Sequence, residues 1–121
     1  MESVLAGRTV VEVSQSPAAG LATMVMADFG ADVIWFEYGG QNGSRAKAEE
    51  PGEGYRVWHR GKRRIPVNLS ATSDAAQSEA DTIREHILAS ADVFVTDLSV
   101  ERLGELGLDW SALGARRPDL V

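Results

Sequence analysis

The feature that most constrains this chain is a pair of apolar runs, near its start, with a helical stretch between them. Residues 8–14 read RTVVEVS and residues 30–37 read GADVIWFE, and both runs are rich in β-branched and aromatic side chains. Continuous apolar runs of this length are typical of parallel strands that are buried on both faces. Two such strands joined by a helix form a right-handed parallel unit, so the sequence predicts an α/β fold.

The segment between the two runs carries signals for both ends of a helix. Ser16 is a suitable N-cap, Pro17 suits the first helical turn, and Gly30 ends the helix. Four apolar residues lie at helical spacing within it: Leu21, Met24, Val25 and Phe29. Because the first strand ends where this helix begins, the junction between them favours an anionic ligand.

A long loop and a second set of elements follow. Residues 38–57 alternate glycines with charges and show no apolar periodicity, which predicts a long loop of the functional or disordered kind. The elements expected after it are an edge strand or extended crossing around Pro66, a helix at 74–90 capped by Thr72 or Ser73, a third parallel strand at 92–96, a short helix at 100–106 ended by Gly107, and a second at 110–117 closed by Pro118. This order predicts a Rossmann-like parallel sheet with flanking helices.

Composition excludes several classes of protein. The chain has no cysteine, which rules out disulfides and thiolate chemistry, and its two histidines start no metal-ligand spacing. The net charge of -6 argues against nucleic-acid binding, and no apolar run approaches the roughly 20 residues of a membrane span. We therefore expect a cytoplasmic protein with no metal and no nucleic-acid or membrane partner.

The length and the last residues suggest a part of a larger unit. A chain of 121 residues is one domain or a piece of one. Leu120 and Val121, after a Pro-Asp pair, have the character of a strand that should continue. We therefore expect residues 1–121 to be a fragment.

The turn after the first strand is small enough for a ligand to approach the backbone. Ser16, Pro17, Ala18 and Ala19 form it, but the G-x-G-x-x-G pattern of dinucleotide folds is missing. Glu37 stands where such folds place a ribose-binding acid, yet acids commonly end strands. A dinucleotide site is therefore the less favoured interpretation.

The only basic cluster of this acidic chain is RGKRR at residues 60–64. Most such runs are solvated charges. This one follows Trp58, contains Gly61 for close approach and precedes a strand-like segment, features that suit a phosphate-rich ligand. Trp58 is the tryptophan placed for a ligand contact, whereas Trp35 and Trp110 are expected in the core.

Asp97 ends the third strand and has two possible roles. It stands at the carboxyl end of the strand, where ligands bind in open α/β sheets. It could equally be the N-cap of the next helix. His86 is expected on a helix surface.

Taken in order, these segments resemble the class III CoA-transferase (CaiB/BaiF) family, which includes formyl-CoA transferase, carnitine CoA-transferase and α-methylacyl-CoA racemase. LAGRTVVE (5–12) looks like the family's L-x-G-x-R-V-(L/V)-(D/E), and ADFGADVI (27–34) with Glu37 is similar to its A-D-L-G-A-D-V-I-K-V-E. HRGKR (59–63) is similar to N-R-G-K-R, and RPDLV (117–121) to N-P-R-L-V. ADVFV (91–95) and LGLDWSAL (106–113) match the strand and helix between them. The resemblance covers nearly the whole chain and corresponds to the family's N-terminal part.

The resemblance implies a large Rossmann-like domain that binds acyl-CoA. In such enzymes an aspartate carboxylate attacks the thioester and CoA passes to a carboxylic acid, whereas racemase members exchange an α-proton with an acid/base pair. Family members are interlaced homodimers. The catalytic aspartate of the family lies beyond the position of Val121, so no catalytic residue is assigned here and we expect the isolated chain to lack transferase activity.

Carried over by position, the resemblance gives candidate CoA-binding residues. Ser16, Pro17 and Ala18 would lie near the thioester end of CoA. His59, Arg60, Gly61, Lys62 and Arg63 would contact CoA, with Lys62 on a phosphate. Asp97, Leu98 and Ser99 would line the same groove.

The chain departs from the family pattern at several of these places. Tyr38 replaces an arginine that reaches the CoA phosphates or adenine, and DLSVE at 97–101 replaces N-F-R-P-G. A further family arginine aligns with either Glu105 or Arg102. These losses keep two alternatives open: a degenerate half of a fused double-length member, and a non-catalytic Rossmann-type nucleotide-binding or interaction module.

Overall fold

A four-stranded parallel sheet forms the centre of the computed structural model, which describes residues 3–38, 57–69 and 74–121. In chain order the strands are β1 (Thr9–Ser14), β2 (Asp32–Glu37), β3 (Arg63–Pro66) and β4 (Val93–Thr96). Their order across the sheet is β3-β2-β1-β4, and all three pairings are parallel. The predicted edge position of Pro66 is confirmed, because β3 is the outer strand beside β2.

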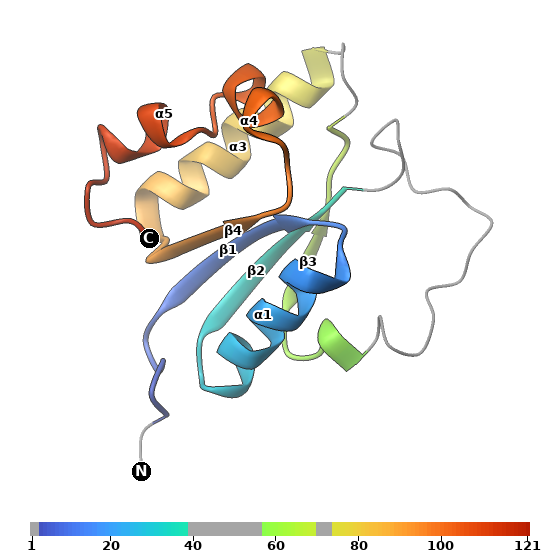
Figure 1. The fold of residues 1–121 in the computed structure, drawn as a ribbon, viewed down its shortest axis with the longest axis vertical. Coiled ribbons are helices and arrows are strands. Elements are labelled where there is room, and N and C mark those ends of the chain that lie inside the picture. Colours follow the sequence, from blue (N-terminus) through green and yellow to red (C-terminus); the bar gives the residue numbers. More distant parts are fainter. Residues whose placement is uncertain (1–2, 39–56, 70–73) are drawn as a thin grey trace, which may run out of the picture.

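Helices cover both faces of this sheet. Figure 1 shows α1 (Pro17–Asp28) on one face and α3 (Asp74–Ser90), α4 (Val100–Leu106) and α5 (Trp110–Gly114) on the other. The predicted α/β class and Rossmann-like sheet are confirmed. The helix predicted at 110–117 ends earlier, at Gly114, because Arg117 turns away to donate to the carbonyl oxygens of Ile87 (3.3 Å), Leu88 (3.1 Å) and Ala91 (2.8 Å).

Local signals set the helix ends as expected. Ser16 caps α1 by accepting a hydrogen bond from the amide of Ala19, and Gly30 follows the helix with φ of 99°. Gly107 ends α4 in the left-handed region. The predicted cap of α3 at Thr72 or Ser73 and most of the predicted loop, residues 39–56, lie outside the described residues.

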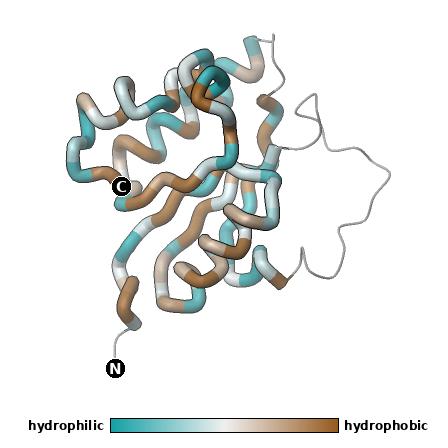
Figure 2. Tube along the Cα trace, in the orientation of Figure 1, coloured by the Kyte–Doolittle hydropathy of each residue, from teal (hydrophilic) through white to brown (hydrophobic). Residues whose placement is uncertain are grey.

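The two faces of the sheet are packed with different chemistry. Toward α3 the strands present apolar side chains, and Ile83 and Ile87 of α3 are fully buried against them. Figure 2 shows these strands as mainly hydrophobic. Toward α1 the sheet presents Glu12 and Trp35, both at most 1% exposed, so polar groups are buried beneath this helix.

The apolar stripe of α1 faces outward. Leu21, Val25 and Phe29 are 45%, 47% and 51% exposed. The buried side of the helix is made of small residues, Ala19, Gly20 and Thr23. Small residues allow the helix to approach the sheet and the 57–62 segment closely, which leaves the larger apolar residues on the other side.

Three predictions concern the burial of tryptophan and histidine side chains, and the structure confirms two of them. Trp35 is buried and His86 is exposed, as expected. The prediction that Trp110 lies in the core is wrong, because its side chain is 60% exposed and lies across Gly114 on the outside of α5. An indole at the first position of a one-turn helix covers the next turn rather than the sheet.

The edge of β4 is paired with the last residue of the chain. The amide of Val121 donates to the carbonyl of Asp92 (3.1 Å), and its carbonyl accepts from the amide of Phe94 (2.9 Å). This is the hydrogen-bond pattern of a parallel strand, in agreement with the strand-like character of residues 120–121. Within the described residues, none of the helices is long and apolar enough to cross a membrane.

Candidate functional site

The topological switch point of the sheet lies between β1 and β4. The chain leaves β1 through α1 on one face, and it reaches β4 from α3 on the other face. Ligands of open α/β sheets bind in the crevice outside the carboxyl ends of the strands at such a point. The turns that flank it here are residues 15–16, after β1, and residues 97–99, after β4.

The Asp97 carboxylate bridges these two turns. One oxygen accepts hydrogen bonds from the amides of Gln15 (3.0 Å) and Ser16 (2.7 Å), and the other accepts from the hydroxyl of Tyr38. The predicted N-cap role of Asp97 is wrong, because Ser99 caps α4 by accepting from the amide of Arg102 (3.1 Å). Asp97 instead joins the ends of three strands, which its position at the end of β4 made possible.

Tyr38 is buried at this junction and 8% exposed. Burial, followed by the hydrogen bond and the negative charge of Asp97, raises the pKa of the Tyr38 hydroxyl well above its ordinary value. The phenol is therefore neutral and acts as a donor. Tyr38, which the resemblance implies stands in place of a family arginine, is thus paired with Asp97.

The other residues of the two turns either use their polar groups in hydrogen bonds within the chain or have no polar side chain. The Ser16 and Ser99 hydroxyls cap α1 and α4. The amide of Leu98 donates to the hydroxyl of Thr96 (3.1 Å). Pro17 and Ala18 are exposed, so their backbone is the accessible part of the turn.

Lys62 does not lie on the surface. Its side chain is fully buried beside Glu12, which is also fully buried, and its Nζ lies 2.9 Å from Glu12 Oε1. The same ammonium donates to the carbonyl of Gly20 (3.0 Å) and lies 3.0 Å from His59 Nδ1. Burial lowers the pKa of Lys62, and the hydrogen bond and charge of Glu12 oppose that effect. In this arrangement the ammonium is not placed to meet a phosphate, and the predicted phosphate contact stays a prediction.

His59 is stacked on Trp35. The ring centroids are 3.5 Å apart and the planes are within 3° of parallel. Because the Lys62 ammonium donates, Nδ1 of His59 accepts and the ring proton lies on Nε2. Burial, followed by the charge of Lys62, lowers the pKa of His59 to about 4, so the ring is neutral at pH 7.

The arginines of the basic cluster are each paired with an acid. Arg60 pairs with Asp28 (2.7 Å), Arg63 with Asp32 (2.5 Å) and Arg64 with Glu37. Gly61 sits between them in the left-handed region, with φ of 75°. The positive charge of the cluster is therefore compensated locally, and its predicted contacts with CoA stay predictions.

Sequence patterns alone do not mark two residues of this region, Glu12 and Gly20, as part of a site. Glu12 accepts from the hydroxyls of Thr23 (2.6 Å) and Ser14 (2.5 Å) as well as pairing with Lys62. Gly20 allows the Trp58 ring to approach, since a Cβ there would lie 2.7 Å from Trp58 Cδ1. The sequence signal for Glu12 is that it is the one acid in the strand-like run at residues 9–14.

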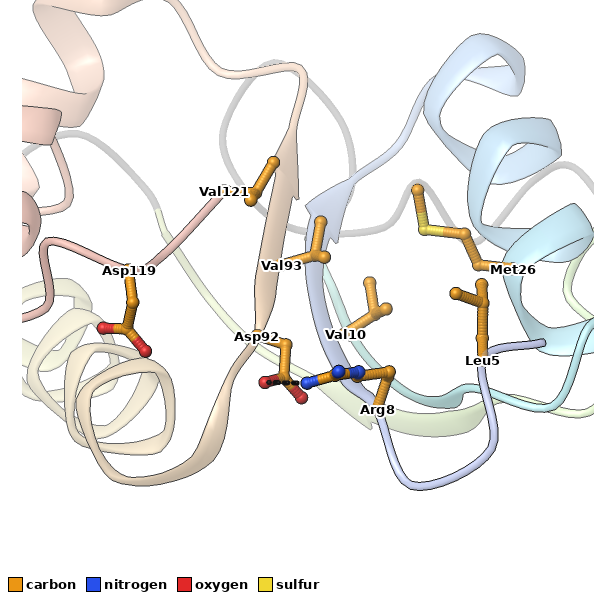
Figure 3. Close-up of a pocket in the computed structure, with 8 residues that line it drawn as sticks. All are labelled: Leu5, Arg8, Val10, Met26, Asp92, Val93, Asp119 and Val121. Atoms are coloured by element: carbon orange, nitrogen blue, oxygen red, sulfur yellow. Dashed lines mark ion pairs between the residues drawn. The ribbon is translucent and has the colours of Figure 1, made fainter.

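A cavity of about 400 Å³ lies at the amino ends of β1 and β4. Figure 3 shows its apolar side chains, among them Val10, Met26 and Val93, and an ion pair between Arg8 and Asp92. This cavity lies at the opposite end of the two strands from the switch point. Across the described ranges, no three acidic or histidine side chains gather closely enough to hold a metal ion.

Known proteins share both the sequence and the fold of this chain. A model of CoA-transferase family III matches residues 5–121. The chain is 28% identical to the cinnamoyl-CoA:phenyllactate CoA-transferase of Clostridium sporogenes, over 98% of its own length and 29% of that protein. It is 29% identical to the succinate–glutarate CoA-transferase of Agrobacterium fabrum, over 97% of its length and 30% of that protein.

Solved structures give the same result. A hypothetical protein (Rv3272) of Mycobacterium tuberculosis superposes with a TM-score of 0.75 at 26% identity, covering 98% of this chain and 32% of that one. A CaiB/BaiF family protein of Brucella suis gives 0.69 at 27% identity, covering 95% and 31%. The chain therefore spans about a third or less of the length of these relatives, in agreement with the expected correspondence to part of the family's length. From the match over residues 5–121, this chain belongs to CoA-transferase family III.

Proposed function

We propose that this chain forms one wall of an acyl-CoA site in a protein that transfers CoA between carboxylic acids. The observation that carries the proposal is the junction at the switch point. Two segments predicted to line the CoA groove, residues 16–18 and 97–99, are joined directly by the hydrogen bond from the Ser16 amide to Asp97. Family membership supplies the class of ligand.

The thioester end of the ligand would approach the accessible backbone of Pro17 and Ala18, with Leu98 and Ser99 across the crevice. No cation faces Asp97 within hydrogen-bond distance in the part of the chain that the structure describes. The turn therefore suits the uncharged pantetheine and thioester portion of CoA better than its phosphates. Contacts from Tyr38, His59, Arg60, Gly61 and Arg63 remain predictions of the resemblance, whereas the burial of the Lys62 side chain argues against the contact predicted for it.

The complete reaction needs groups that lie outside residues 1–121. Transfer in this family would use an aspartate nucleophile and a carboxylic-acid acceptor, and racemisation would use an acid/base pair instead. We expect the whole protein to supply these groups, as an interlaced homodimer, and the isolated chain to bind without turnover. A cytoplasmic location remains an expectation.

A second candidate is a non-catalytic unit that has lost tight CoA binding, such as the degenerate half of a double-length member. The compensated charges favour it: Arg60, Lys62, Arg63 and Arg64 each pair with a carboxylate of the same chain. Such a unit would serve as a scaffold for another domain.

Titration of the isotope-labelled chain with CoA, followed by amide chemical shifts, distinguishes the candidates. The proposal expects shifts at Ala18, Leu98 and Ser99 with CoA and smaller ones with NAD or ATP. A response to NAD alone, or none to any nucleotide, would exclude CoA binding by this chain and favour the scaffold. Desulfo-CoA is the matched ligand that should reproduce the shifts.

A further inference from the structure

The buried pair of Lys62 and Glu12 joins three segments: β1, α1 and residues 57–62. Glu12 belongs to β1, and Lys62 precedes β3. Gly20, whose carbonyl accepts from Lys62, lies in the first turns of α1, and His59 lies in the turn at residues 57–61. The ammonium is therefore a common partner for His59, three residues away, and for two groups that are more than 40 positions away in the sequence, on Glu12 and Gly20.

The hydrogen-bonding capacity of the ammonium is fully used by these partners. Lys62 has three N–H donors, and it has three acceptors: Glu12 Oε1 (2.9 Å), the Gly20 carbonyl (3.0 Å) and His59 Nδ1 (3.0 Å). With its side chain completely buried, no donor is left to point at a phosphate. Binding a phosphate would require the ammonium to give up one of these three partners, which would leave a buried acceptor without its donor.

The same contacts place the network directly behind the turn after β1. The Ser14 hydroxyl donates to Glu12, and the Ser14 carbonyl accepts from the indole of Trp35 (3.1 Å), on which His59 stacks. Ser14 is followed by Gln15 and Ser16, whose amides hold Asp97. A shift of Lys62 would therefore move both the end of β1 and the first turns of α1.

We propose that Lys62 is a positioning residue, which together with Glu12 fixes the first turns of α1 against β1 and so shapes the crevice wall at residues 16–18. This inference rests on the proposed function for the identity of the crevice ligand. Lys62 acts through Gly20 and Ser14 and does not touch the ligand.

Buried ion pairs have an energetic signature that makes the role testable. Removing one partner leaves the other charge buried and uncompensated, which is strongly destabilising. Replacing both by uncharged groups of similar shape is often neutral, because no charge then has to be desolvated. Lys62→Met and Glu12→Gln keep the approximate shapes of the two side chains.

The experiment compares Lys62→Met, Glu12→Gln and the double variant with the unmodified chain, and uses Arg116→Met, an exposed cation, as the control. The first readouts are the denaturant midpoint and the amide shifts of Ser16 and Ala18 without ligand. Each single variant should lower the midpoint and displace these amides. The double variant should recover most of the midpoint, because no uncompensated charge is left buried. It should not recover the amide shifts, because the Gly20 carbonyl and His59 Nδ1 still lack the ammonium. Arg116→Met should change neither readout.

CoA binding is the second readout. The double variant should bind CoA more weakly than the unmodified chain, because the wall at residues 16–18 is displaced, but its CoA affinity should keep the same dependence on salt, because no contact with a phosphate is lost. If Lys62 instead bound a CoA phosphate directly, loss of its ammonium would flatten the salt dependence of CoA binding. That result, or additive losses in the single and double variants, would overturn the proposal. If the unmodified chain does not respond to CoA, the proposed function fails, and the ligand-free readouts still decide the role of Lys62.

Discussion

At the scale of single residues, the junction of Tyr38 and Asp97 shows how this chain arranges charge at its crevice. A carboxylate that accepts two backbone amides and a phenol hydroxyl is well solvated by the protein itself. Its negative charge nevertheless remains at the switch point. The pair therefore holds three strand ends together and disfavours a second anion at the same turn.

The neutral state of Tyr38 can be measured directly. The sequence contains two tyrosines, so Tyr55→Phe leaves Tyr38 as the only ionising phenol. Its raised pKa means that the folded chain keeps the proton above pH 10 while the unfolded chain releases it, so stability is lost as pH rises beyond that value. Tyrosinate absorbance should then appear together with unfolding.

Replacing Asp97 with Asn in that background keeps an acceptor for the turn amides and removes the charge. The pKa of Tyr38 should fall, because the charge contribution is lost while burial remains. An unchanged alkaline titration would contradict the pairing of Tyr38 with Asp97.

His59 should make the stability of the chain depend on mildly acidic pH. Its pKa of about 4 in the folded chain lies below the ordinary 6.5, so the unfolded chain binds more protons between these values. Stability should therefore fall as pH drops from about 6.5 to 4, by at most about 3 kcal/mol.

The variant His59→Asn offers an acceptor to Lys62 without a titrating ring. It should reduce this pH dependence when denaturant midpoints are compared at pH 7 and pH 4.5. His86→Asn, an exposed position, is the matched control and should leave the dependence unchanged. Equal slopes for the His59 variant and the parent would argue against the buried imidazole.

At the scale of the elements, two glycines in helices have opposite surroundings. A Cβ added to Gly20 in α1 would lie 2.7 Å from Trp58 Cδ1, whereas one added to Gly104 in α4 would meet nothing within 4 Å. Alanine is favoured over glycine in both helices by helix propensity alone, by up to about 1 kcal/mol. Contact with Trp58 should make the substitution by alanine destabilising at Gly20, while it stays stabilising at Gly104.

We therefore expect Gly20→Ala to destabilise the chain by about 1–3 kcal/mol, the usual range for overpacking. Gly104→Ala should stabilise it by about 0.5–1 kcal/mol. Denaturant unfolding of both variants checks the pair. Stabilisation by Gly20→Ala would mean that the indole of Trp58 moves away at little cost.

The same elements show what could be predicted from the sequence. Signals that act over a few residues were sufficient, which is why the boundaries at Ser16, Gly30 and Gly107 and the apolar strands were correct. The orientation of α1 was not available from its spacing, because a stripe of apolar residues does not state which side meets the sheet. Burial of Lys62 was hidden as well, since its partner Glu12 is 50 positions away and its neighbours are basic.

At the scale of the whole molecule, the sheet separates an apolar half from a half with buried charges. Ile83 of α3 is fully buried, whereas Leu21 of α1 is 45% exposed. Ile83→Ala should cost about 2–5 kcal/mol, because it removes buried methyl groups and leaves a cavity. Leu21→Ala should cost less than about 1 kcal/mol. Thermal or denaturant unfolding of the two variants tests this asymmetry, and comparable losses would contradict it.

The strand order β3-β2-β1-β4 also predicts an order of events in folding. β1 precedes the other three described strands in the chain and lies inside the sheet, and the hydrogen bond from the Thr9 amide to the Asp92 side chain spans 83 positions. Contacts between residues that are far apart in the sequence form slowly, because closing the long intervening loop costs conformational entropy. On a ribosome, β1 can join β2 early, while its other edge stays bare until β4 emerges. Pulse-labelled hydrogen exchange during refolding should accordingly protect the amides between β1 and β2 before those between β1 and β4.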